Sequence, residues 1–291
     1  RHSRKHYKIT APMGADMTTL GPVAAIHREL GSDTQGVLLH GWLDNAESFS
    51  LLAPQLSISS WALDLPGHGL SPWLADGADY YIWSYLPMLT EALQQLPEQT
   101  SVVLVGHSLG TAAALQLAAL YPERITALVL LDGIGPQSSL ESKWLAQMQQ
   151  ALKWQPKPRR VLKSTDDALA VRAKATPSIE SQVLRIMVER ALEPHHGGWR
   201  WRADPRLPAP SKMRLTEALV QAMLGAVRCP VLAVRAEQGI LPLALYRERI
   251  VGIKDVQCVD LPGHHHFHLQ RDASSRIASR MQDFLEQVGV V

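Results

Sequence analysis

Residues 101–120 read SVVLVGHSLGTAAALQLAAL, and this stretch decides the fold. Ser101–Val105 is an apolar run of the kind found in a strand that is buried on both faces of a parallel sheet. Thr111–Leu120 is rich in Ala and Leu and predicts a helix. Gly106 and Gly110 allow the backbone to turn sharply between the two elements. The stretch therefore predicts a strand, a tight turn and a helix.

Ser108 lies within this turn, in the pattern Gly-x-Ser-x-Gly. Such a turn lifts a serine hydroxyl above the edge of the sheet, beside the first free N–H groups of the following helix. A bare Gly-x-Ser-x-Gly is common, but its position between an apolar strand and an Ala-rich helix is specific. The pattern predicts that Ser108 is a nucleophile.

Further strand-like runs precede and follow this unit and alternate with helical patterns. They cover Val23–Leu30, Gly36–His40, Trp61–Leu65, Ile125–Leu131, Val231–Val234 and Val256–Leu261. This alternation predicts the α/β class, with a mostly parallel central sheet that is flanked by helices.

The rhythm of short strands stops between residues 133 and 227, where helix-start signals take over. These signals are Ser138 with Glu141 as a capping box, Ser164, Pro177 and Thr216. We predict that residues 1–132 and 228–291 form the sheet domain and that residues 133–227 are an inserted helical lid.

A second chemical element follows the Gly36–His40 run, at His40-Gly41-Trp42. Attack on a carbonyl creates an oxyanion, which preorganised N–H donors stabilise. We predict the backbone N–H groups of Leu109 and Trp42 as the two donors. His40 is expected to be a structural histidine beside the substrate site and not the base.

Five segments of the sequence carry a resemblance to a known family. They are His40–Asn45, Asp64–Ser71, Gly106–Gly110, Leu131–Pro136 and Trp201–Leu207. With them the chain resembles α/β-hydrolase-fold enzymes from Val23 to Val290, and most resembles the serine hydrolase-like subgroup. The resemblance implies a catalytic triad of a serine, an acid and a histidine, which follow one another in that order along the chain.

The base is expected after the last strand, where His264, His265, His266 and His268 crowd together. In similar hydrolases the catalytic histidine comes five positions before an acidic or amide residue, and counting back from Gln270 gives His265. His264 is the alternative base. His266 and His268 are expected to pack the loop or line the pocket, and a metal site in this tract is the less favoured interpretation.

The acid is harder to assign, because Gly239 stands where similar hydrolases have an aspartate. Asp132, directly after the strand that follows the nucleophile helix, is our first candidate, since some relatives use this position. Glu237 is the alternative. A turn residue that ends a strand is the non-catalytic interpretation of Asp132.

The function predicted from these residues is carboxylic ester hydrolysis through an acyl-enzyme, on small or medium apolar substrates and without a metal or other cofactor. The candidate substrate-binding residues are His40, Trp144, Trp199 and Trp201. The same triad also fits a C–C bond hydrolase or a cofactor-free haloperoxidase. A non-catalytic hydrolase-fold protein that binds a ligand is the alternative from a different class.

Composition excludes several other partners. The formal net charge of +2 over 291 residues gives no indication of nucleic acid or anionic membrane. No apolar segment approaches the roughly 20 residues that cross a bilayer. Cys229 and Cys258 are expected to be free and buried, which favours a cytoplasmic protein. Arg1, Arg4, Lys5 and Lys8 are expected to form a solvated tail, and the sequence does not indicate an oligomeric state.

Overall fold

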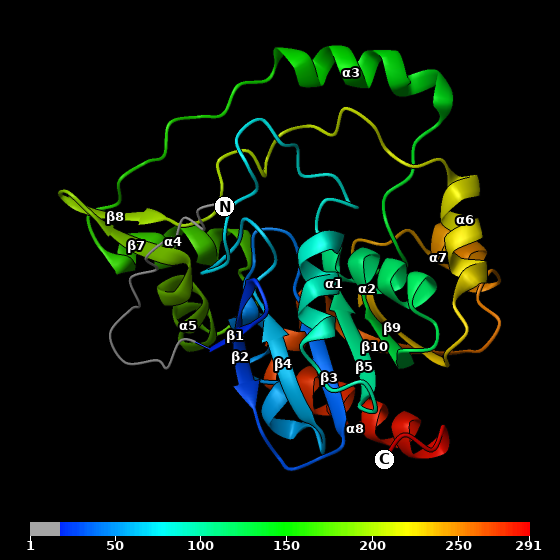
Figure 1. The fold of residues 1–291 in the computed structure, drawn as a ribbon. Helices are drawn as coiled ribbons and strands as arrows, with labels where there is room; N and C mark the ends of the chain where they lie inside the picture. Colours follow the sequence, from blue (N-terminus) through cyan, green and yellow to red (C-terminus); the bar gives the residue numbers. More distant parts are fainter. Residues whose placement is uncertain (1–17) are drawn as a thin grey trace, which may run out of the picture.

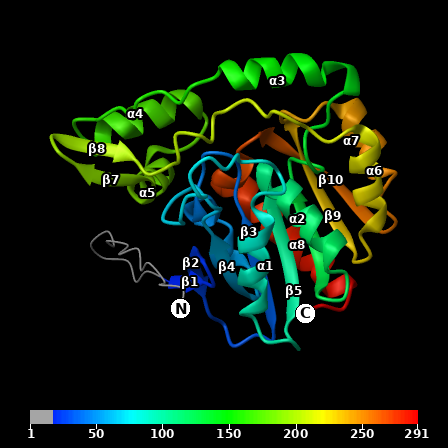
Figure 2. The same cartoon turned by 45° about the horizontal axis from the view of Figure 1, so that its top comes forward.

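The computed structural model describes residues 18–291, which form an eight-stranded sheet with helices on both faces (Figures 1 and 2). The strand order is β1-β2-β4-β3-β5-β6-β9-β10, and β2 alone runs antiparallel to both of its neighbours. The strands are β1 (Thr18–Leu20), β2 (Val23–Arg28), β3 (Thr34–Leu39), β4 (Ser59–Leu63), β5 (Ser101–His107), β6 (Ile125–Leu131), β9 (Val231–Gln238) and β10 (Val256–His264). The mostly parallel α/β sheet predicted from the sequence is confirmed.

Strand β5 shows how the two faces of this sheet divide the core. Val102 and Leu104 point into one hydrophobic cluster, and Val103 and Val105 point into the other, because neighbouring side chains of a strand alternate between faces. The first cluster lies under α1 (Leu86–Gln94), α2 (Leu109–Leu120), α6 (Glu217–Ala226) and α7 (Leu243–Ile250); the second lies under α8 (Arg271–Gln287). Burying each Val or Leu side chain contributes about 1.5–3 kcal/mol.

Strands β9 and β10 extend further than their apolar runs predicted. Their parallel pairing continues to Leu261 opposite Ala236 and, after an irregularity, to His264 opposite Gln238. The chain therefore holds Glu237 on a strand and not in a loop.

The segment between β6 and α6 crosses the carboxyl end of the sheet (Figure 1). Its elements are α3 (Trp144–Lys153), α4 (Thr165–Ala175), α5 (Ser181–Ala191) and a hairpin of β7 (Leu192–His195) and β8 (Gly198–Trp201). The sequence did not predict the hairpin. Gly197, with φ of +79°, permits its short turn.

Two of the four predicted helix starts are correct. Ser164 caps α4 in a capping box with Asp167, and Thr216 caps α6. The third helix begins at Ser181, after a turn, and not at Pro177.

The predicted capping box at Ser138 is wrong, because its hydroxyl donates to Glu217 Oε2 (2.6 Å) and so ties this segment to α6. Helix α6, although inside the predicted lid, buries Val220 and Leu224 in the main core cluster. The division at residues 132 and 227 stays a prediction.

Of the two free cysteines, Cys229 is buried as expected, but Cys258 is exposed. Cys258 lies on β10, an edge strand most of whose side chains face solvent. In the described part of the chain, no helix has the length and apolar character needed to span a membrane. The basic tail of Arg1, Arg4, Lys5 and Lys8 lies outside the described residues.

A buried arginine on α7 fixes the start of the segment that crosses the sheet. Arg249 is only 1% exposed, and its guanidinium donates to the carbonyl oxygens of Ile134 (2.7 Å) and Pro136 (2.8 Å). It also forms two bonds with Glu217, at 3.0 and 2.8 Å. A planar cation with several donors is suited to holding a carboxylate and two carbonyls at once.

We expect Arg249→Met to lower the free energy of unfolding by about 3–5 kcal/mol, because it removes one member of a largely buried ion pair and leaves buried carbonyls without donors. Urea denaturation followed by circular dichroism measures this. Arg247→Met, on the exposed side of the same helix, is the control and should change stability by less than about 0.5 kcal/mol. Equal losses in the two variants would contradict the anchoring role of Arg249.

Candidate active site

Ser108 lies at a strained turn between β5 and α2, with φ of +52°. A Cβ at Gly106 would lie 2.5 Å from Gly110 O, and a Cβ at Gly110 would lie 1.9 Å from Leu39 O. Only glycine fits at either position, so the close approach of strand, turn and helix explains the Gly-x-Ser-x-Gly pattern. The turn leaves Ser108 partly exposed at the end of the sheet.

The structure brings three side chains together, each from just beyond the end of a strand: Ser108 after β5, Asp132 after β6 and His265 after β10. Ser108 Oγ lies 2.9 Å from His265 Nε2, and His265 Nδ1 lies 2.6 Å from Asp132 Oδ2. The Asp132 side chain is fully buried and the His265 side chain is largely so. The three side chains form a continuous chain of hydrogen bonds from carboxylate to hydroxyl.

Hydrogen bonds to backbone groups hold both the main chain and the carboxylate of Asp132 in place. Its own N–H donates to Val234 O (2.8 Å), and its carboxylate accepts from Ala236 N (3.1 Å) and Ile240 N (3.3 Å). Its φ of +44° turns the side chain across the end of β9 toward His265. Asp132 therefore joins the ends of two neighbouring strands.

The same geometry explains the glycine at position 239. A Cβ at Gly239 would lie 2.2 Å from Asp132 Oδ1, so the Asp132 carboxylate already fills the space of a side chain at 239. An acid at Asp132 and a side chain at 239 exclude each other. The alternative acid, Glu237, is exposed, and no hydrogen bond joins it to His265 in residues 18–291. The alternative base, His264, is also exposed and lies on β10.

The loop after β3 faces the same turn. Asp44 N donates to Gly41 O (3.1 Å), and Leu43 between them has φ of +60°. Leu43, Ser108 and Asp132 are the non-glycine residues with positive φ in residues 18–291, and all three lie at this site. Such strain persists where the surrounding structure holds it, and it clusters at functional sites.

The two predicted oxyanion donors occupy different surroundings. Leu109 is the first residue of α2, so its N–H has no acceptor within the helix. Trp42 is 50% exposed, and its indole donates to Leu207 O (3.2 Å) across the site. This contact ties the loop after β3 to the segment that leaves the hairpin.

The four candidate substrate-binding residues are scattered. His40 is fully buried, accepts from Leu65 N through Nε2 (2.9 Å) and donates to Gly41 O through Nδ1 (2.7 Å), so it cannot contact substrate and is structural. Trp144 is 44% exposed on α3 and does not line the cavity described below. Trp199 and Trp201 both pack against the small hydrophobic cluster beside the hairpin, and Trp201 also lines that cavity.

The sequence did not single out His107, which stands between Gly106 and Ser108 in the serine motif. Its Nε2 donates to the backbone oxygen of His265 (2.9 Å), and the centroids of the two rings lie 4.7 Å apart. Burial and the neighbouring imidazoles lower the pKa of His107 well below its usual range, so it stays neutral. His107 therefore supports the loop that carries His265, and its place beside Ser108 in the sequence was the only signal for this role.

The other histidines of the tract pack against this pair. His268 is buried, its ring lies 4.0 Å from that of His107, and its Nε2 bonds to Ser48 Oγ (2.8 Å). His266 Nε2 lies 3.7 Å from Asp44 Oδ2. In the part of the chain that the structure describes, no three His, Cys, Asp or Glu side chains are grouped so that they could hold a metal ion.

This arrangement of sheet, serine turn and histidine loop has counterparts among known proteins. A family model described as alpha/beta hydrolase fold matches residues 37–178. A solved structure of a hypothetical protein from Pseudomonas aeruginosa PAO1 is 36% identical, covers 89% of this chain and 93% of that protein, and superimposes with a TM-score of 0.81. The chain belongs to the α/β-hydrolase-fold superfamily.

Within this superfamily the chain is similar to serine hydrolase-like proteins. One from Dictyostelium discoideum is 29% identical over 276 residues, which is 88% of this chain and 75% of the relative. An esterase from Mycobacterium tuberculosis is 31% identical over 192 residues, covering 63% of this chain and 61% of the esterase. The resemblance predicted from the sequence is confirmed.

The buried histidines make stability depend on pH. Burial lowers the pKa of His40, His107 and His268, and it lowers the pKa of His68 to about 3. Below about pH 6.5 the unfolded chain gains protons that these native side chains cannot take up. Stability is therefore full above about pH 6.5 and is lost as the pH falls, by up to about 1.4 kcal/mol per pH unit for each histidine.

We expect urea denaturation at pH 7.5, 6.5 and 5.5 to show this loss, and His68→Gln to reduce the slope below pH 6.5 by up to about 1.4 kcal/mol per pH unit. His195→Gln, at an exposed position of the hairpin, is the control and should leave the slope as it is. An unfolding free energy that stayed constant between pH 7.5 and 5.5 would contradict the neutral state of these side chains.

Proposed function

We propose that this protein is a serine hydrolase that cleaves carboxylic esters through an acyl-enzyme. The observation that carries the proposal is the chain of hydrogen bonds from Asp132 through His265 to Ser108, at 2.6 and 2.9 Å. Both distances suit proton transfer between the hydroxyl and the imidazole. The esterase among the relatives supports the choice of ester as the bond that is cleaved.

The first half of the reaction forms the acyl-enzyme. Ser108 Oγ attacks the carbonyl carbon while His265 Nε2 takes its proton. Asp132 accepts from His265 Nδ1–H, which fixes the tautomer and stabilises the imidazolium. The imidazolium then gives its proton to the leaving alkoxide as the ester bond breaks.

Water completes the cycle, with His265 again as the base. The water attacks the acyl-enzyme while His265 takes its proton. Collapse of the second tetrahedral intermediate then releases the carboxylic acid, and His265 returns the proton to Ser108 Oγ. The N–H groups of Leu109 and Trp42 are proposed to hold the oxyanion in both halves, and losing one such donor costs about 10²–10³ in rate. Neither half requires a metal or an organic cofactor, and an apolar acyl chain of small or medium length is proposed.

The first test is hydrolysis of p-nitrophenyl esters from acetate to decanoate by the wild type and by Ser108→Ala. We expect turnover by the wild type and a loss of at least about 10⁴ in kcat in the variant, since the nucleophile is gone. A fluorophosphonate probe should label Ser108, as read by mass spectrometry of the intact protein.

The outcomes of this test separate the alternatives. Labelling of Ser108 without turnover of any ester would point to C–C bond hydrolysis or haloperoxidase chemistry on the same triad. Neither labelling nor turnover by folded protein would sink the enzyme proposal and leave a binding protein of this fold.

The second test transfers the triad carboxylate from position 132 to position 239. We expect Asp132→Gly to lower kcat by about 10³–10⁴, because His265 loses its orienting partner. Gly239→Asp alone should be damaging, since the new side chain meets the Asp132 carboxylate. The double variant Asp132→Gly/Gly239→Asp frees that space and should recover at least about tenfold over Asp132→Gly.

Glu237→Gln is the control for this exchange and should stay within about twofold of the wild type, because Glu237 is exposed and makes no hydrogen bond to His265 within residues 18–291. The ester series measures all four variants. A double variant no more active than Asp132→Gly would count against the shared space as the reason for Gly239, and an inactive Glu237→Gln would move the acid to Glu237.

A further inference from the structure

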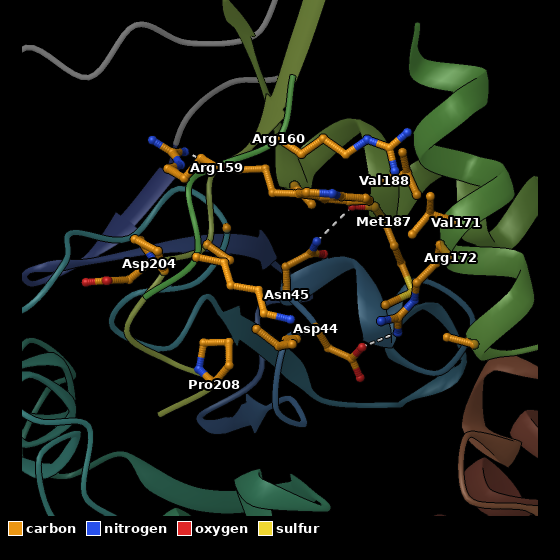
Figure 3. Close-up of a pocket in the computed structure, with 18 of the residues that line it drawn as sticks. Asp44, Asn45, Arg159, Arg160, Val171, Arg172, Met187, Val188, Asp204 and Pro208 are labelled. Carbon is orange, nitrogen blue, oxygen red and sulfur yellow. Dashed lines mark hydrogen bonds and ion pairs between the residues drawn. The ribbon is translucent and has the colours of Figure 1, made fainter. Parts of the chain in front are cut away.

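A cavity of about 610 Å³ lies between the loop after β3 and the helices that cross the sheet (Figure 3). Leu43, Asp44 and Asn45 line it from the loop, and α4 and α5 line it with Val171, Arg172, Met187 and Val188. Asn45 donates to Met187 O (2.8 Å), and Arg172 pairs with Asp44. These contacts hold the helices to the loop around the space.

The cavity adjoins the candidate active site. Leu43 directly follows Trp42, the proposed oxyanion donor. At the floor, Asp44 Oδ2 lies 3.7 Å from His266 Nε2, and the ring of His266 lies 5.0 Å from that of His265. Ser108 and His265 do not themselves line the cavity, so a substrate whose carbonyl sits at Ser108 would enter it by passing the loop at Leu43 and Asp44.

The lining carries more positive than negative charge. Its cations are Lys157, Arg159, Arg160 and Arg172, and its carboxylates are Asp44 and Asp204. Both carboxylates already have cationic partners, because Arg172 binds Asp44 and Arg206 binds Asp204 (2.7 Å). Within residues 18–291, no carboxylate lies within ion-pair distance of Lys157 or Arg160.

The remaining lining cation, Arg159, shares its carboxylate with two other arginines. Glu193 lies 2.9 Å from Arg159, 2.6 Å from Arg200 and 3.7 Å from Arg202. Three guanidinium groups thus share one carboxylate, and this excess of positive charge favours an anion at this end of the cavity. Lys157, Arg159 and Arg160 belong to the extended segment after α3, whereas Arg172 belongs to α4. Arg159 and Arg160 lie at the opposite side of the cavity from Asp44 (Figure 3).

The walls between the loop and the cations are apolar. The large apolar side chains that line it include Val171, Met187, Val188, Trp154 and Trp201. An apolar chain that lies along these walls would have the loop after β3 on one side and Arg160, from the segment after α3, on the other (Figure 3).

We infer that the cavity binds the acyl chain of a substrate whose far end carries an anionic oxygen group, a carboxylate or a phosphate, held by Lys157 and Arg160. The inference rests on the proposed function and replaces a wholly apolar acyl chain by one with a charged end. Lys157 and Arg160 are then specificity residues and take no part in the bond cleavage.

The turnover test compares p-nitrophenyl monoesters of dicarboxylic acids of four to ten carbons with esters of monocarboxylic acids of the same lengths. For at least one length we expect the terminal carboxylate to raise kcat/KM about tenfold or more, as charge-assisted hydrogen bonds do. The gain should shrink when NaCl is raised from about 50 to 500 mM. p-Nitrophenyl ω-phosphonoalkanoates distinguish a phosphate end from a carboxylate end.

The decisive variant is Lys157→Gln/Arg160→Gln, in which the charged-to-neutral ratio of kcat/KM should fall to about one. Lys153→Gln/Lys163→Gln removes the same charge from nearby exposed positions that do not line the cavity, and it should keep the wild-type ratio. No gain for either anionic series, or a gain that survives in Lys157→Gln/Arg160→Gln, would overturn the inference.

A binding measurement separates this inference from the proposed function. Isothermal titration calorimetry of Ser108→Ala with octanedioate should give a dissociation constant that rises about tenfold or more when Lys157 and Arg160 are also changed. Binding that depends on these two residues in a protein that hydrolyses no ester would leave the cavity assigned and the ester proposal refuted. Ester turnover without binding that depends on Lys157 and Arg160 would support the ester proposal and refute the assignment of the cavity.

Discussion

The buried carboxylate of Asp132 is the constraint on which the rest of the site depends. It accepts from the backbone at the end of β9, pairs with His265 after β10 and follows β6, so it ties three strand ends together. A buried carboxylate must have its oxygens satisfied, and here the donors are two N–H groups and one imidazole. Because the carboxylate occupies the space beside residue 239, that position is restricted to glycine.

Other buried carboxylates attach the crossing helices to this centre. Asp64 accepts from Ala46 N and Leu70 N and binds Arg190 of α5 at 3.0 Å, while Asp44 binds Arg172 of α4. Each pair has one member on the sheet domain and the other on the helices above it. Removing either partner would leave a charge buried without compensation, which costs several kcal/mol. The ion pairs thus hold α4 and α5, which line the cavity, against the segments that follow β3 and β4.

Much of the fold and part of the site could be predicted from residues near one another in the chain. The apolar strands, the glycines around Ser108 and the capping at Ser164 all act locally, and local chemistry is what sequence patterns record. The errors occurred where a distant partner decided the outcome. Ser138, expected to cap a helix, donates its hydroxyl to Glu217 of α6 instead. Full burial and the bond from Leu65 N agree with the structural role expected for His40 and exclude it only from the candidate substrate-binding residues.

The sequence alone predicted the sheet, the serine turn and Ser108 at its tip, because the close approach at Gly106 and Gly110 permits few other residues at these two positions. It could only rank Asp132 above Glu237 and His265 above His264. In the tertiary structure a hydrogen bond joins Asp132 to His265, a contact that sequence patterns do not record because the two residues lie 133 positions apart and meet where β6, β9 and β10 end. Their catalytic roles stay a prediction. The same meeting of distant segments created the cationic cavity, whose charges come from the segment after α3 and from α4, and whose floor comes from the loop after β3.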